Sequence, residues 1–125
     1  RIVLSTELLS HLGRPEIRTI LAHEMAHIAL NHGVSEPDLL LDPKRAQHRQ
    51  WHHEFQADSV AAALHGPEQT AGALTKLRSM SAQKAAREAG TPMAAFLITH
   101  FSDAWDQRLA MHADHPSMRA RLAHI

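Results

Sequence analysis

The sequence predicts a mostly helical α+β fold in a single domain of 125 residues. Helix signals recur along the chain, because a capping side chain or a proline precedes most of the segments with apolar residues at helical spacing. The β-prone run Ile2-Val3-Leu4 predicts one short strand over residues 1–5. Hydrophobic residues make up 44% and charged residues 21% of the chain, as is usual for a globular domain.

Each expected helix has a recognisable start. Ser5 or Thr6 caps a short first helix. Proline stands in the first turn of the next three helices, at Pro15, Pro43 and Pro67. The expected helices cover residues 6–12, 15–32 (ended by Gly33), 43–64, 67–80 and 93–111, with a last short helix from 116, a loop over 33–42 and a turn at Gly90.

Charge balance and cysteine content exclude several function classes. Lys plus Arg and Asp plus Glu number 13 each, whereas a dedicated nucleic-acid-binding domain normally carries a basic excess. No cysteine is present, which excludes disulfide scaffolds and thiolate zinc sites. Twelve histidines point to a metal site or a pH switch, and a histidine-rich surface is the simpler alternative.

The start of the sequence suggests a piece of a longer protein. The chain begins at Arg1, directly before apolar residues, which favours a domain cut from a larger parent. No stretch approaches the roughly 18 consecutive apolar residues of a membrane span, so these residues are expected to be soluble. Membrane association through other parts of the parent stays open, and the compartment is not predicted.

Residues 23–27 form an H-E-x-x-H motif inside the second expected helix. His23 and His27 are about 40° apart around a helix, so both can bind one metal ion. Glu24 lies about 100° from His23 and can hold a water molecule beside that ion. Catalytic zinc normally takes three protein ligands and keeps one position open, so a third ligand is expected elsewhere in the chain.

The third expected helix offers that ligand. Glu54 and Asp58 are four residues apart, on the helix face that also carries Trp51 and Phe55. A carboxylate on an apolar stripe is costly to bury unless it is paired or bound to a metal. Zinc for Glu54, and the free ring N–H of a ligand histidine for Asp58, would satisfy both groups. The alternative is that this face is a solvent-exposed helix edge.

Three segments occur in a specific order, namely the motif at residues 23–27, then Glu54-Phe55-Gln56-Ala57-Asp58, then His115-Pro116-Ser117 followed by Arg121. Together they resemble the HtpX and CAAX-prenyl protease type of gluzincin zinc metallopeptidase. The resemblance implies a compact zincin-like α+β domain with a small sheet beside the active-site helix. It also implies a zinc-dependent endopeptidase that acts on proteins or peptides. The family usually has more strand upstream than this chain carries.

The resemblance also implies a role for each matching residue. His23, His27 and Glu54 would bind one zinc ion per domain. Glu24 would be the general base and then the acid toward the leaving amine, and Asp58 would orient a ligand histidine.

The resemblance extends to the C-terminal segment. His115 would lie by the active site and stabilise the oxyanion, and Arg121 would hold this segment or assist there. A helix-capping turn at Asp114-His115-Pro116 is the alternative, with no catalytic role for His115.

The other histidines have simpler explanations. A third histidine ligand of the metzincin type would fall at position 33, which is Gly33. His32 is expected to be a helix-end histidine favoured by the helix dipole. His52 and His53, with His48, are expected on the surface, and a second metal site there is the alternative.

Three other functions remain open. One is a non-catalytic or latent zinc-binding regulatory module on the same scaffold, although a structural zinc site has no use for the general base Glu24. Another is a regulatory metallopeptidase that cuts one repressor-like partner. The third is a pH sensor built from histidines.

Overall fold

The computed structural model describes residues 2–33, 42–93 and 116–125. The helices within these ranges are α1 (Thr6–His11), α2 (Arg14–Ala29), α3 (Pro43–His65), α4 (Pro67–Glu88) and α7 (Met118–His124). The expected helix over 93–111 and the loop over 33–42 lie almost wholly outside the described residues.

The predicted small sheet, and with it the α+β class, is wrong for the part of the chain that the structure describes. Residues 2–5 have no regular secondary structure, and no other described residue is in a strand. A β-prone run becomes a strand only where a second strand exchanges ladder hydrogen bonds with it, and none does so in these ranges. The described fold is helical.

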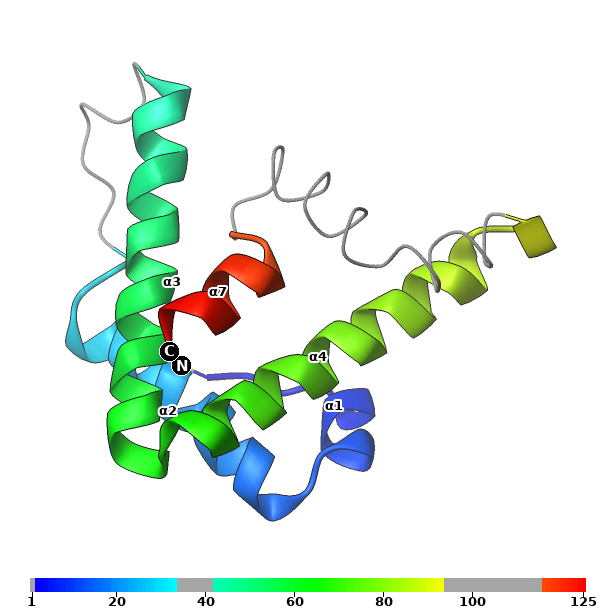
Figure 1. Ribbon diagram of the computed structural model, residues 1–125, viewed down its shortest axis with the longest axis horizontal. Helices are drawn as coiled ribbons and strands as arrows, with labels where there is room; N and C mark the ends of the chain where they lie inside the picture. The colour runs from blue at the N-terminus through cyan, green and yellow to red at the C-terminus, as the bar shows by residue number, and fades with distance from the viewer. Residues whose placement is uncertain (1, 34–41, 94–115) are drawn as a thin grey trace.

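The helices pack around a core of small side chains. α3 and α4 are connected at Gly66 and diverge from there (Figure 1). α2 crosses near this connection, and α7 lies between α3 and α4 (Figure 1). Both α2 and α7 contact α3 and α4. Five of the eight buried hydrophobic residues in the described ranges are alanines, at positions 22, 26, 57, 61 and 73. Because alanine lets helix backbones approach closely, polar groups on α2, α3 and α7 come within reach of one another.

The predicted capping residues are confirmed at two helix starts. Ser5 Oγ accepts a hydrogen bond of 3.1 Å from the Leu8 N–H. Asp42 Oδ1 accepts from the N–H groups of Lys44 and Arg45, at 3.0 and 3.2 Å. Each cap satisfies backbone donors that the first turn of a helix leaves without an intrahelical partner.

α2 ends earlier than its sequence predicts. The helix stops at Ala29 instead of running to residue 32, because Asn31 adopts a left-handed conformation with φ of 58°. The His32 N–H donates to the His27 carbonyl at 2.9 Å, and the Asn31 N–H donates to the Ile28 carbonyl at 3.2 Å. These two bonds make a Schellman motif, in which asparagine takes the place usually held by glycine. The chain therefore turns back on α2 two residues before Gly33.

α4 is longer than predicted. It continues through residues 81–88, beyond the expected end at residue 80, and ends at Glu88. These residues are rich in alanine, lysine, arginine and glutamate, which have high helix propensity even without a regular apolar stripe. The predicted turn at Gly90 is confirmed by a positive φ of 71°.

The long helices are tied together by polar contacts near the start of α2. Lys76 on α4 pairs with Glu16 on α2. The amide of Gln69 donates to the Pro15 carbonyl at 3.2 Å and to Thr19 Oγ1 at 3.3 Å. These contacts fix the distance between α2 and α4, and so the width of the space between them.

Replacing Gly66 by alanine is expected to lower the free energy of unfolding by about 1–3 kcal/mol. Gly66 joins α3 to α4 with φ of 91° and ψ of 147°, a conformation that essentially only glycine adopts. A Cβ there would meet nothing within 4 Å, so the cost comes from the backbone alone. Chemical denaturation measures the loss. Gly72→Ala, at a helical position that is also uncrowded, is the control and should stabilise the chain slightly. Equal stability of both variants would contradict the prediction.

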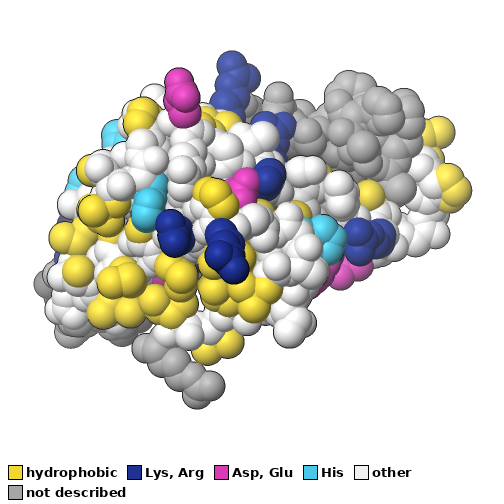
Figure 2. Space-filling view, turned by 90° about the horizontal axis from the view of Figure 1, so that it is seen from below, with side chains coloured by type: hydrophobic (Ala, Val, Ile, Leu, Met, Phe, Trp, Pro, Cys, Tyr) yellow, Lys and Arg dark blue, Asp and Glu magenta, His cyan; other side chains and the backbone are white. Residues whose placement is uncertain are grey.

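Several large apolar side chains stay exposed. They include Val3, Leu9, Met25, Ile28 and Leu64. Figure 2 shows hydrophobic side chains gathered over part of the face seen from below. None of the helices in the described ranges is both long enough and apolar enough to cross a membrane.

Candidate metal centre

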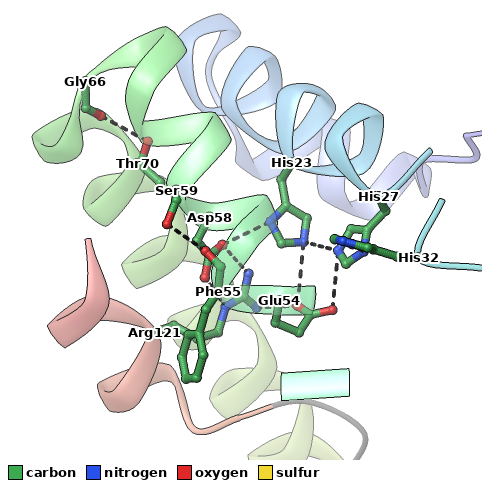
Figure 3. A network of polar contacts seen from close by, with 10 residues as sticks. All are labelled: His23, His27, His32, Glu54, Phe55, Asp58, Ser59, Gly66, Thr70 and Arg121. Carbon is green, nitrogen blue, oxygen red and sulfur yellow. Dashed lines mark hydrogen bonds and ion pairs between the residues drawn. The ribbon is translucent and has the colours of Figure 1, made fainter. Parts of the chain in front are cut away.

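α2 and α3 bring three potential metal ligands together. His23 and His27, one turn apart on α2, face Glu54 on α3 (Figure 3). The Nε2 atoms of the two histidines are 3.0 Å apart. His23 Nε2 lies 3.6 Å from Glu54 Oε2, and His27 Nε2 lies 3.4 Å from Glu54 Oε1. Residues about 30 positions apart in the sequence therefore converge on one point.

The spacing of these atoms fits a zinc ion. Donors held about 2.0–2.1 Å from a tetrahedral zinc lie roughly 3.3 Å from one another. The two Nε2 atoms are 3.0 Å apart, and each lies 3.4–3.6 Å from a different oxygen of the Glu54 carboxylate, so these separations are close to that value. Two imidazoles and one carboxylate are also a donor set that zinc commonly takes at catalytic sites.

Asp58 lies behind His23. Its Oδ1 atom is 2.9 Å from His23 Nδ1, which turns the opposite nitrogen, Nε2, toward Glu54 and His27. A carboxylate behind a histidine is the arrangement that fixes ligand histidines in metal sites. Glu54 is 2% and Asp58 is 1% exposed, so the alternative of a solvent-exposed helix edge is wrong.

Arg121 supports both carboxylates from α7. Its Nε donates to Asp58 Oδ2 at 2.8 Å and its Nη2 to Asp58 Oδ1 at 2.7 Å, while Nη1 lies 3.5 Å from Glu54 Oε2. Burial alone would raise the pKa of Asp58, but hydrogen bonds from Arg121 and His23 outweigh it and lower that pKa. Burial likewise lowers the pKa of Arg121, and its pairing with Asp58 reverses the shift. Both groups are therefore held in their charged forms.

Asp58 and Glu54 also act on His23. Burial lowers the pKa of His23, but hydrogen bonds to the two carboxylates outweigh that effect and raise the pKa to about 9. In the metal-free chain His23 is therefore protonated at neutral pH, with Asp58 beside its Nδ1 and Glu54 beside its Nε2. A metal ion bound at Nε2 would have to displace the proton on that nitrogen.

Metal-free protein is expected to lose stability as the pH rises from about 6.5 to about 9. The folded-state pKa of His23 lies above the ordinary histidine value of 6.5, so its contribution to stability is complete below pH 6.5 and disappears as the pH passes about 9. Thermal unfolding of chelator-treated protein across this range measures the change. Asp58→Asn removes one of the carboxylates responsible and should flatten the dependence. A Tm of the wild type that does not vary with pH would contradict the prediction.

A cavity of about 330 Å³ lies beside the three donor side chains. Glu24 lines it together with His23 and His27. Ile20 on α2 and Leu74 on α4 contribute apolar wall. The cavity thus leaves room for a bound molecule next to Glu24 and the donors.

The remaining residue of the predicted catalytic set, His115, lies outside the described residues. Arg121 was expected to hold the C-terminal segment or to assist catalysis, and the structure puts its guanidinium against Asp58 and Glu54. The buried ion pair between Arg121 and Asp58 joins residues that are 63 positions apart. No periodic pattern in the sequence indicates a contact between them.

Two further histidines lie next to the centre, although the sequence suggested helix-end and surface positions for them. His32 Nδ1 is 3.0 Å from His27 Nδ1, and the ring of His53 stacks on that of His32. In the sequence, the position of His53 directly before Glu54 was the one hint that these histidines lie near the centre. That position does not indicate the direction of the His53 ring.

Comparison with known proteins covers only part of the chain. Residues 1–40, which include the H-E-x-x-H motif and His32, match the family model described as peptidase family M48. No curated protein and no solved structure matches the chain. The match supports the metallopeptidase resemblance over the N-terminal third of the chain, whereas Glu54, Asp58 and Arg121 lie outside the matched residues.

Proposed function

We propose that this chain is the catalytic domain of a zinc-dependent metalloendopeptidase of the gluzincin type, which hydrolyses peptide bonds in proteins or peptides. The family match over residues 1–40 supports the coarser class of metallopeptidase. The observation that carries the finer assignment is the convergence of His23, His27 and Glu54 with separations of 3.0–3.6 Å.

The proposed mechanism divides the work among residues of α2 and α3. His23, His27 and Glu54 would hold the zinc ion, and Asp58 would keep His23 in the required tautomer and orientation. Bound zinc would polarise the scissile carbonyl and acidify a water molecule. Glu24, in the same cavity, takes the proton from the attacking water and delivers it to the departing nitrogen. No nucleophilic side chain is needed.

The cavity supports a peptide substrate. Charged and polar groups line it together with the apolar side chains of Ile20, Leu74 and Leu77. A peptide bond presented to Glu24 could therefore place a neighbouring apolar side chain against α4, where burial of that side chain would favour binding.

Zinc stoichiometry of purified protein without a metal-binding tag tests this proposal. Chelator-treated wild type should take up about one zinc per chain, and Glu54→Ala should bind it much more weakly because only two protein ligands remain. Glu68→Ala, at an exposed position on α4, is the matched control and should bind as the wild type does. Failure of the wild type to bind zinc after reconstitution would overturn the proposal.

A further inference from the structure

The contacts of His27 continue beyond the metal centre. While its Nε2 faces His23 and Glu54, its Nδ1 lies 3.0 Å from Nδ1 of His32. The two rings meet edge to face, with centroids 5.0 Å apart and planes at 76° (Figure 3). Each nitrogen of His27 therefore has a defined neighbour, as each nitrogen of His23 has.

His32 is itself held in place from α3. The rings of His32 and His53 are stacked, with centroids 4.0 Å apart and planes within 2° of parallel. His53 directly precedes Glu54, so the same turn of α3 supplies a donor to the metal centre and a flat surface behind His32. The position of His32 is therefore tied to the helix that carries Glu54.

The backbone fixes His32 as well. The left-handed Asn31 reverses the chain, and the His32 N–H donates to the carbonyl of His27, the residue that its side chain also faces. Backbone and ring contacts thus join the same two residues. Because both backbone and ring contacts already hold His32, little further conformational entropy is lost when it orients His27.

We propose that His32 is a positioning residue for His27, and that His53 supports it by ring stacking. This inference rests on the proposed function, because it takes His27 to be a zinc ligand through Nε2. A neutral imidazole that binds metal through Nε2 carries its proton on Nδ1. That proton is donated to Nδ1 of His32, which must then carry its own proton on Nε2. His32 therefore accepts the Nδ1 proton of His27, as Asp58 accepts that of His23. The acceptor is a neutral imidazole at His27 and a carboxylate at His23.

The chemical difference between the two supports has a consequence. Asp58 is a buried carboxylate that is paired with Arg121, whereas the imidazole of His32 adds no negative charge to the centre. Two ligand histidines backed by two carboxylates would add a further negative charge beside Glu54. A neutral support orients His27 without that cost.

Zinc affinity of His32 variants tests the inference. Chelator competition should show zinc binding weakened about 10- to 100-fold in His32→Ala, the usual loss when an outer-shell partner is removed. His32→Asn can place an amide oxygen near the former Nδ1 and should recover most of the affinity. His53→Ala should lie between them, and His53→Phe, which keeps a flat ring, should remain close to the wild type. His52→Ala is the matched control, since His52 is the exposed neighbour on the same helix.

A nuclear magnetic resonance measurement separates positioning from a merely structural role. Long-range proton–nitrogen spectra of imidazole-labelled, zinc-loaded protein should show His27 protonated at Nδ1 with a slowly exchanging proton, and His32→Ala should speed that exchange. Wild-type zinc affinity together with unchanged exchange in His32→Ala would overturn the inference and leave the proposed function intact. A wild type that binds no zinc would overturn both.

Discussion

Replacing Glu24 by glutamine is expected to lower kcat for peptide hydrolysis by about 100- to 10,000-fold while leaving zinc bound, because the change removes general acid–base catalysis alone. Glutamine keeps the size of glutamate and its capacity to accept a hydrogen bond, but it cannot take a proton from water near neutral pH. Glu24 lines the cavity with His23 and His27 and is not among the three converging donor side chains. The loss should therefore fall on the chemical step.

Three measurements on the same preparations make this prediction specific. kcat and KM with a peptide library should show the loss in kcat, zinc stoichiometry should remain at the wild-type value, and the unfolding temperature should change little. Met25→Gln provides the matched control, since the adjacent side chain on α2 is 60% exposed. Hydrolysis by Glu24→Gln at the wild-type rate would contradict the peptidase mechanism.

Much of the candidate site could be predicted because helical spacing is a local property. The four-residue intervals between His23 and His27, and between Glu54 and Asp58, place each pair on one helix face without any knowledge of the tertiary fold. The cost of burying carboxylates then predicts that Asp58 needs a partner such as a ligand histidine, and it lies 2.9 Å from His23. These inferences use only periodicity and desolvation.

Other features depend on contacts that periodicity does not reveal. The position of His32 depends on the left-handed conformation of Asn31, which ends α2. In the sequence, Gly33 was the stronger signal for the end of this helix. The predicted strand fails in the described ranges because strand formation depends on a partner elsewhere. Arg121 was singled out through the family resemblance, whereas its bidentate pairing with Asp58 depends on how α7 packs between α3 and α4.

Replacing Arg121 by methionine is expected to lower the free energy of unfolding by about 3–5 kcal/mol, the usual loss when one partner of a buried ion pair is removed. Methionine fills much of the same space, so the loss would come from leaving the buried Asp58 without its two guanidinium donors. Chemical denaturation of metal-free protein measures it. Arg119→Met, at an exposed position on the same helix, is the control and should change stability by no more than about 0.5 kcal/mol.

A double-mutant cycle distinguishes loss of the ion pair from loss of packing. Asp58→Asn combined with Arg121→Met removes both charges, so the double variant should lose less stability than the sum of the two single variants. Strict additivity would show that Arg121 stabilises α7 through its packing and not through Asp58. The same pair links the C-terminal helix to the metal centre, because Asp58 also contacts His23. Arg121→Met should consequently weaken zinc binding although Arg121 is not one of the three converging donors, and Arg119→Met should not.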